Sequence, residues 1–139
     1  MPTDNRRRAT VALIGAVAIA AGLTIYALFR PVRIPLIPAG LHFATAKSHT
    51  PAVLGVVPSV IHAFAMPLLT VACLRLPRRH IASACLAWCA IDLVFEAGQR
   101  TDIAFFPAGT FDPLDLLAVL LGVALAAAVG FATLRSTSR

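Results

Sequence analysis

Residues 57–98 read VPSVIHAFAMPLLTVACLRLPRRHIASACLAWCAIDLVFEAG, two apolar stretches joined by a short basic segment around Pro77. Each stretch holds about 20 residues, and an α-helix of that length crosses about 30 Å of hydrocarbon. The segment between them is long enough only for a turn, and its arginines favour the cytoplasmic face of a membrane. The stretch therefore predicts a transmembrane hairpin with spans at about 57–76 and 81–98.

Two more apolar runs flank this hairpin, at about residues 9–29 and 113–134. The last run has a strong helix start, because Asp112 can cap it, Pro113 fits its first position and Asp115 favours the positive end of the helix dipole. The chain is therefore predicted to be all-α, a bundle of four transmembrane helices.

The segments on the side away from the basic turn are predicted to be external loops. Residues 30–56 contain four prolines and cannot form one continuous helix. Residues 99–112 are largely polar and also contain proline and glycine. A cleaved signal peptide is the alternative for residues 9–29, because a basic start precedes small residues, but the apolar run is longer than a signal core. Residues 1–139 then form one integral membrane domain.

The composition is that of a membrane protein. Hydrophobic residues make up 59% of the chain, charged residues 13%, and the mean hydropathy is +0.85. Soluble domains are about half apolar and about a quarter charged. The net charge of +6 comes from arginine clusters beside apolar runs, so it indicates topology. The expected partner is the lipid bilayer, and no nucleic acid is expected.

The basic residues divide unequally between the two sides of the predicted bundle. The side with the termini and the basic turn holds Arg6, Arg7, Arg8, Arg75, Arg78, Arg79, Arg135 and Arg139. The other side holds Arg30, Arg33, Lys47 and Arg100. The positive-inside rule then predicts that the N- and C-termini are cytoplasmic.

The third span carries a polar stripe, since Asp92, Glu96 and Gln99 recur at i, i+4 and i+7 on one helix face. A carboxylate in hydrocarbon costs about 2.5 to 3.5 kcal/mol even on insertion scales, so these acids should face the bundle interior or a wet cavity. His62, near the outer end of the second span, is the best candidate partner, followed by Arg100. The alternative is that the acids reach interfacial water and His62 is an ordinary interfacial residue.

The last span carries a face of small residues, which lets two helices approach closely in lipid. This face consists of Ala118, Gly122, Ala126 and Gly130. We expect the partner helix to belong to the same chain, with another protein as the alternative. A matching face in the first span would consist of Ala12, Ala16 and Ala20.

The cysteines and histidines do not suggest a metal or cofactor. Cys73, Cys85 and Cys89 form no CxxC pair and are predicted to be reduced packing residues. His80 is spaced off the face that Cys85 and Cys89 share, so the three are a poor metal site. A haem would need two facing histidines at matched depth, and only His62 is well placed. We therefore predict no metal and no cofactor.

Three features of residues 52–126 resemble the VanZ-like family of small bacterial membrane proteins with four helices. His62 opens the second span, and Glu96 with Gln99 matches the E-x-x-Q of that family. The stretch 111–122, FDPLDLLAVLLG, is similar to its D-x-x-x-N-x-x-G signature. The sequence departs from the family pattern at three polar positions. Val119 stands where the family has an asparagine, and Met66 stands where a tyrosine is usual. Thr110 lies near the place of an arginine that often precedes the aspartate in the family.

The resemblance implies a multi-pass protein of the bacterial cytoplasmic membrane with a role in the cell envelope. The family is named for an accessory protein of glycopeptide antibiotic resistance. Binding of a lipid-linked or glycopeptide-type ligand at an outward-facing polar pocket is then expected, and the sequence does not decide whether a reaction follows. The predicted ligand-binding residues are His62, Asp92, Glu96, Gln99, Arg100 and Asp115.

Two other functions fit the same sequence. The first is a non-catalytic accessory subunit of a larger membrane complex, which would expose the small-residue face of the last span in the isolated chain. The second is a proton-coupled transporter that uses Asp92 and Glu96 as a relay. Four spans would have to oligomerise to form such a path.

Overall fold

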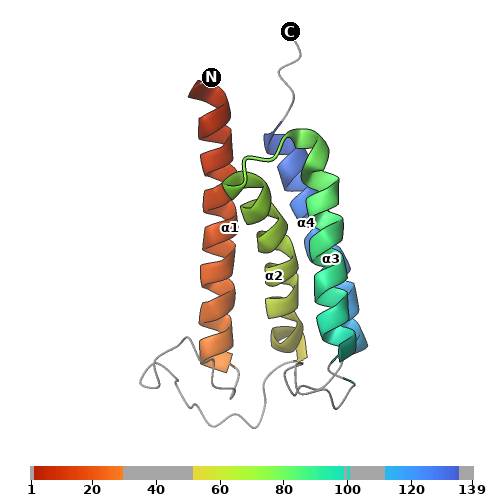
Figure 1. The fold of residues 1–139 in the computed structure, drawn as a ribbon. Coiled ribbons are helices and arrows are strands. Elements are labelled where there is room, and N and C mark those ends of the chain that lie inside the picture. The colour runs from red at the N-terminus through yellow and green to blue at the C-terminus, as the bar shows by residue number, and fades with distance from the viewer. Residues whose placement is uncertain (1, 30–51, 99, 101–111, 135–139) are drawn as a thin grey trace.

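The computed structural model describes residues 2–29, 52–98, 100 and 112–134, and within them the secondary structure is entirely helical. Four α-helices run alternately up and down (Figure 1). They are α1 (Pro2–Phe29), α2 (Ala52–Cys73), α3 (Ile81–Gly98) and α4 (Pro113–Thr133), with a short 3-10 helix, η2 (Arg78–His80), before α3.

Each of the four α-helices is long and apolar enough to cross a membrane. The candidate spans are Asp4–Ile25, Val56–Cys73, Arg78–Gly98 and Pro113–Thr133. The prediction of an all-helical chain with four such helices is confirmed, and it indicates a multi-pass membrane protein. The predicted external loops lie mostly outside the described residues, at 30–51 and 101–111.

Helix α2 differs from its predicted bounds at both ends. It begins at Ala52, inside the predicted loop 30–56, because the apolar residues before Pro58 extend the helix past that proline. It ends at Cys73, and Arg75 then takes the left-handed conformation with φ 52°. The N–H of Leu76 donates to Val71 O at 3.0 Å, the bond that closes a Schellman motif.

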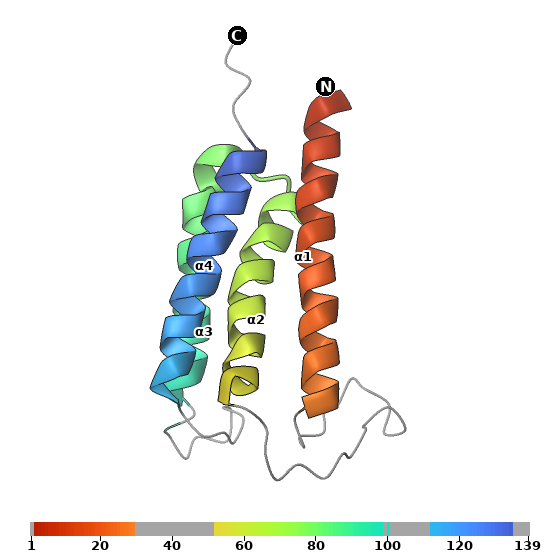
Figure 2. The same ribbon diagram turned by 180° about the vertical axis from the view of Figure 1, so that it is seen from behind.

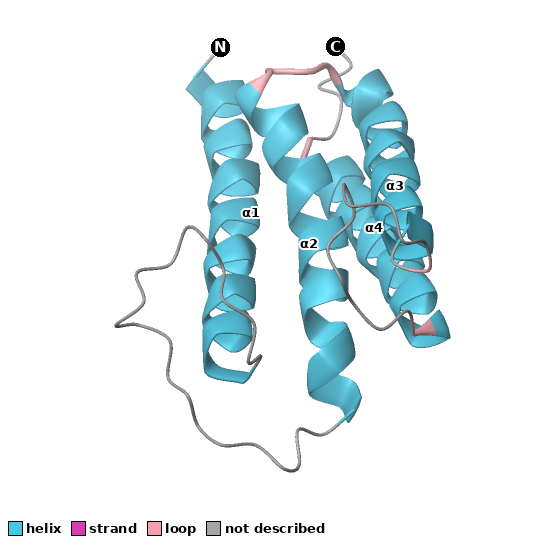
Figure 3. Ribbon diagram, turned by 60° about the horizontal axis from the view of Figure 1, so that its bottom comes forward, coloured by secondary structure: helices cyan, strands magenta, loops and turns pink. Residues whose placement is uncertain are grey.

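The two ends of the bundle differ in what they contain. We call the end with the start of α1, residues 74–80 and the end of α4 the turn end (Figures 1 and 2). We call the opposite end, where α2 and α4 begin and α3 finishes, the loop end. Helix α2 lies centrally, with α1 on one side and with α3 and α4 on the other, as Figure 3 shows from the loop end.

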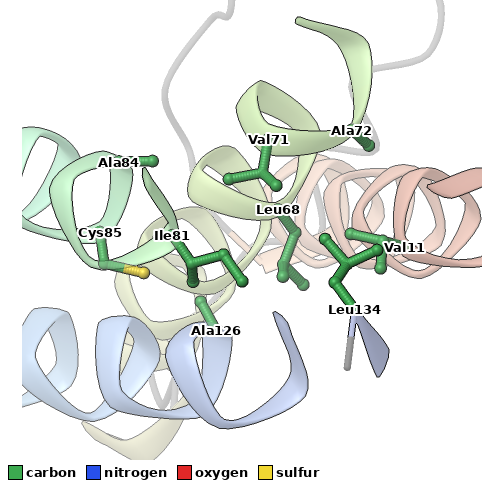
Figure 4. Packing of buried hydrophobic residues seen from close by; sticks show 9 residues of the cluster. All are labelled: Val11, Leu68, Val71, Ala72, Ile81, Ala84, Cys85, Ala126 and Leu134. Atoms are coloured by element: carbon green, nitrogen blue, oxygen red, sulfur yellow. The ribbon is translucent and has the colours of Figure 1, made fainter. Parts of the chain in front are cut away.

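A cluster of buried apolar residues occupies the turn-end half of the bundle. All four helices contribute to it (Figure 4), through Val11, Leu68, Val71, Ala72, Ile81, Ala84, Cys85, Ala126 and Leu134. The start of α1 is fastened to the turn by Arg8, whose Nη1 donates to Leu76 O at 2.9 Å. The guanidinium of Arg78 lies 4.9 Å from the centroid of the Phe131 ring, and so it ties η2 to α4.

The small-residue face of α4 packs inside the same chain. A Cβ at Gly122 would clash with Val60 O and lie 2.9 Å from Ala63 Cβ, so α4 approaches the backbone of α2 very closely here. Ala118 is 3% exposed and Ala126 is 0% exposed. The face thus packs against a helix of the same chain, as expected, and it lacks the exposure that the accessory-subunit alternative would require.

The partner helix of that face is α2, and the proposed match with Ala12, Ala16 and Ala20 of α1 is wrong. Ala16 and Ala20 are exposed. Helix α1 packs on α2 through its two glycines, with Gly15 against Leu69 and Gly22 against Ile61. The small residues correctly indicated close helix packing. Because α2 lies between α1 and α4, each of these two helices packs on α2 and not on the other.

The outer surface of the bundle is apolar over most of its length. Large exposed apolar side chains include Leu13 and Val17 on α1, Leu86 and Val94 on α3, and Leu117, Leu120 and Leu121 on α4. Such an extent of exposed apolar surface is unfavourable in water and is favourable against lipid.

Candidate functional site

A histidine and an aspartate connect α2 and α3 within the apolar bundle. His62 Nδ1 lies 3.1 Å from Asp92 Oδ1. The side chain of Asp92 is 10% exposed and that of His62 is 47% exposed. His62 therefore covers a buried carboxylate and remains partly accessible itself.

Asp92 Oδ2 is buried and has no hydrogen-bond partner among the described residues. A buried polar atom without a partner costs free energy, and such atoms concentrate at functional sites. The pair thus holds a buried acceptor without a donor among the described residues.

An indole fixes the other side of the imidazole. The rings of His62 and Trp88 meet edge to face, with their centroids 5.9 Å apart and an interplanar angle of 82°. Trp88 Nε1 donates a hydrogen bond of 2.8 Å to Thr70 Oγ1. A continuous set of contacts between α2 and α3 therefore runs through Thr70, Trp88, His62 and Asp92. We call these four residues the polar seam.

A second carboxylate is held by α2 nearer the loop end. Ser59 Oγ donates to Asp115 Oδ1 at 3.0 Å, and Asp115 is 7% exposed. Asp112 caps the same helix by accepting from Leu114 N at 2.9 Å. Ser59 and His62 are three residues apart on α2, about 4.5 Å along the helix axis. Two buried carboxylates are thus attached to neighbouring positions of one helix.

The structure brings some of the predicted ligand-binding residues together. His62 and Asp92 are in contact, and Asp115 bonds to a residue one turn from His62. Glu96, one turn beyond Asp92 toward the loop end, is half-buried, and Arg100 is exposed. Gln99 lies outside the described residues.

Sequence reasoning missed Ser59 and Thr70. Both share a helical face with His62, at positions i−3 and i+8, so the polar residues of α2 formed a stripe like the one on α3. Reading that stripe in the second span would have identified both residues.

The arrangement favours binding of groups that donate hydrogen bonds, because its carboxylates accept them. A carboxylate on Nδ1 orients an imidazole and leaves Nε2 as its second hydrogen-bonding atom. A buried carboxylate on this histidine, and a second one bonded to Ser59 one turn away on α2, suit a ligand group that donates hydrogen bonds or carries positive charge. The described residues contain no group of three or more His, Cys, Asp or Glu side chains that could hold a metal ion.

These features define a class, a multi-pass bundle of four helices that carries two buried carboxylates, Asp92 and Asp115, each bonded to a side chain of α2. Comparison of the chain with protein-family models, with curated proteins and with solved structures finds no match. The residues that bear on function are therefore those of the polar seam and the Ser59–Asp115 pair.

Proposed function

We propose that this chain is a VanZ-like protein of the bacterial cell envelope that binds the polar headgroup of a lipid-linked molecule. The site is the loop-end half of α2, α3 and α4, which faces outward, with both termini in the cytoplasm. One observation carries the proposal: Asp92 and Asp115 are both buried, and each bonds to a side chain of α2. Buried acids within a membrane span are costly and mark ligand or ion sites.

The chemistry of the pairs favours the sugar or peptide part of such a molecule over its phosphate. Ionised carboxylates only accept hydrogen bonds, and they repel phosphate. Hydroxyl, amide and amine groups donate to them. The exposed leucines of α4, such as Leu117 and Leu121, offer an apolar surface for the lipid chain of the same ligand.

The test is binding of defined probes to the full chain in lipid nanodiscs. The probes are a polyprenyl-diphosphate-linked disaccharide peptide, the matching polyprenyl phosphate and a glycopeptide antibiotic. Trp88 is the only tryptophan in the chain and touches His62, so its fluorescence reports occupancy of the site. We expect the disaccharide peptide lipid to change the emission and the polyprenyl phosphate to change it much less.

Substitutions separate binding at the site from general lipid effects. Asp92→Asn and Asp115→Asn remove the charge of the two buried acids and should each weaken binding about tenfold or more. Asp4→Asn removes an exposed acid at the turn end and is the matched control. Equal binding by all three variants, or a response to the phosphate alone, would argue against the proposal.

An accessory-subunit function has less support, because the face predicted to contact a partner is occupied by α2.

A further inference from the structure

Arginine side chains crowd the turn end of the bundle. Arg6, Arg75 and Arg79 are exposed there, and they come from α1, the α2–α3 turn and η2. Three further arginines belong to the same end, Arg7, Arg8 and Arg78. The described acid at this end is Asp4, which already binds Arg8 at 2.9 Å.

The segments that carry these arginines are held in place by contacts with the rest of the bundle. Arg8 fastens α1 to Leu76 O, and Arg78 rests on the Phe131 ring of α4, so the arginine-bearing segments are joined to one another. The Schellman motif at the end of α2 sets the direction of Arg75. The arginines therefore present their charge from a rigid base at one end of an apolar bundle.

An exposed apolar side chain lies among these arginines. Leu74 precedes Arg75 and is 67% exposed. Next to the lipid-facing surface, a large exposed leucine beside an exposed arginine suits the boundary where acyl chains meet headgroups.

We propose that the turn end binds anionic glycerophospholipids, with Arg6, Arg75 and Arg79 contacting their phosphates and Leu74 lying among their acyl chains. Guanidinium groups match phosphate oxygens in both charge and geometry. A juxtamembrane basic residue near an anionic surface contributes about a five-fold preference for it. The loop end has the opposite balance, because Asp92, Glu96, Asp112 and Asp115 outnumber Arg100 among its described residues.

The experiment measures which lipids remain bound to the full chain. Protein in nanodiscs that contain equal amounts of phosphatidylcholine and phosphatidylglycerol is extracted mildly, and the retained lipids are counted by native mass spectrometry. We expect retained phosphatidylglycerol to exceed phosphatidylcholine at least five-fold. The R6Q/R75Q/R79Q variant should lose most of this excess, and the R6K/R75K/R79K variant should keep most of it.

A pair of single variants tests the location. Arg79→Gln at the turn end should reduce the excess, and Arg100→Gln at the loop end should leave it unchanged. Nanodiscs present two equivalent faces, so a variant that would insert upside down in a cell still meets the same lipids.

Two outcomes would overturn the proposal. One is equal retention of the two lipids by the unaltered chain, and the other is an excess that the triple glutamine variant keeps. If that variant does not fold, lipid retention by the unaltered chain is measured at high salt instead. About 1 M salt shortens the Debye length to about 3 Å and should abolish the phosphatidylglycerol excess. An excess that persists in such salt would contradict the assignment to arginine charge.

Discussion

The imidazole of His62 and the carboxylate of Asp92 lie 3.1 Å apart, Nδ1 to Oδ1, and link α2 to α3 near the middle of both helices. A cluster of buried apolar residues that includes Leu68, Ile81 and Ala126 lies toward the turn end. The buried acids Asp92 and Asp115 lie outside this cluster. Buried acids are costly among apolar side chains, so they favour a role beyond packing.

The first prediction concerns the two partners of this contact. His62→Ala should destabilise the fold by about 1–3 kcal/mol, because it removes the one hydrogen-bond partner that the buried Asp92 carboxylate has among the described residues. The double variant His62→Leu/Asp92→Leu should be at least as stable as the unaltered chain, because well-packed apolar residues often replace a buried pair without loss. Thermal unfolding in detergent measures both. A double variant less stable than His62→Ala would contradict this view of the pair.

The four spans were predictable because lipid imposes a simple rule. A crossing helix needs about 20 apolar residues, and α4 shows this plainly with its cap at Asp112 and its start at Pro113. The ends of α2 were harder to place. Its C-terminus depends on Arg75 in the left-handed region, a conformation usually taken there by glycine, so the sequence carried no signal for it.

The candidate site was predictable in its acids and less so in its partners. Asp92 stood out because a carboxylate in an apolar span is rare, and His62 was the nearest polar residue at a suitable depth. Threonines in membrane helices often bond their own backbone, as Thr10 does to Arg6 O and Thr24 to Ala20 O. Thr70 instead accepts from a tryptophan of another helix, which required the relative rotation of α2 and α3.

The second prediction concerns the closest helix approach. Gly122→Ala should destabilise the fold by about 2–3 kcal/mol or more, because the added Cβ would clash with Val60 O, and a backbone atom cannot move aside as a flexible side chain can. Gly130→Ala is the matched control on the same face, since its Cβ would meet the flexible Ile81 side chain at 3.1 Å. Unfolding by heat or by a denaturing detergent compares the two. Equal losses would show that the backbone contact is not what limits the packing.

The third prediction concerns the indole of the polar seam. Thr70→Val removes the acceptor of the 2.8 Å bond from Trp88 Nε1 and should cost about 1 kcal/mol while leaving an indole N–H unsatisfied. Trp88→Phe should lower the unfolding free energy less in the Thr70→Val variant than in the unaltered chain, because the hydrogen bond is already lost there. A double-mutant cycle on unfolding free energies measures the coupling. Strictly additive effects would mean that the bond contributes nothing.

The fourth prediction concerns the attachment of α1 to the turn. Arg8→Gln should cost about 1.5–3 kcal/mol, because it breaks a charged hydrogen bond to Leu76 O that spans two distant parts of the chain. Asp4→Asn removes the exposed partner of the same guanidinium and should cost at most about 1 kcal/mol. Amide hydrogen exchange in the first turns of α1 should rise in the arginine variant and change little in the other. Equal exchange in both would assign the attachment to apolar packing alone.

The fifth prediction concerns orientation in the membrane, on which the proposed outward-facing site depends. The arginines of the turn end should hold that end in the cytoplasm, since the rule follows the excess of Lys and Arg beside the spans. In a chain with its three cysteines changed to serine, Arg100→Cys should react with a membrane-impermeant maleimide in intact spheroplasts, and Asn5→Cys should react only after lysis. Both positions are exposed and lie at opposite ends of the bundle, so each is the control for the other. The reverse labelling pattern would place Asp92 and Asp115 in the cytoplasmic half and would remove the basis for a site that faces the envelope.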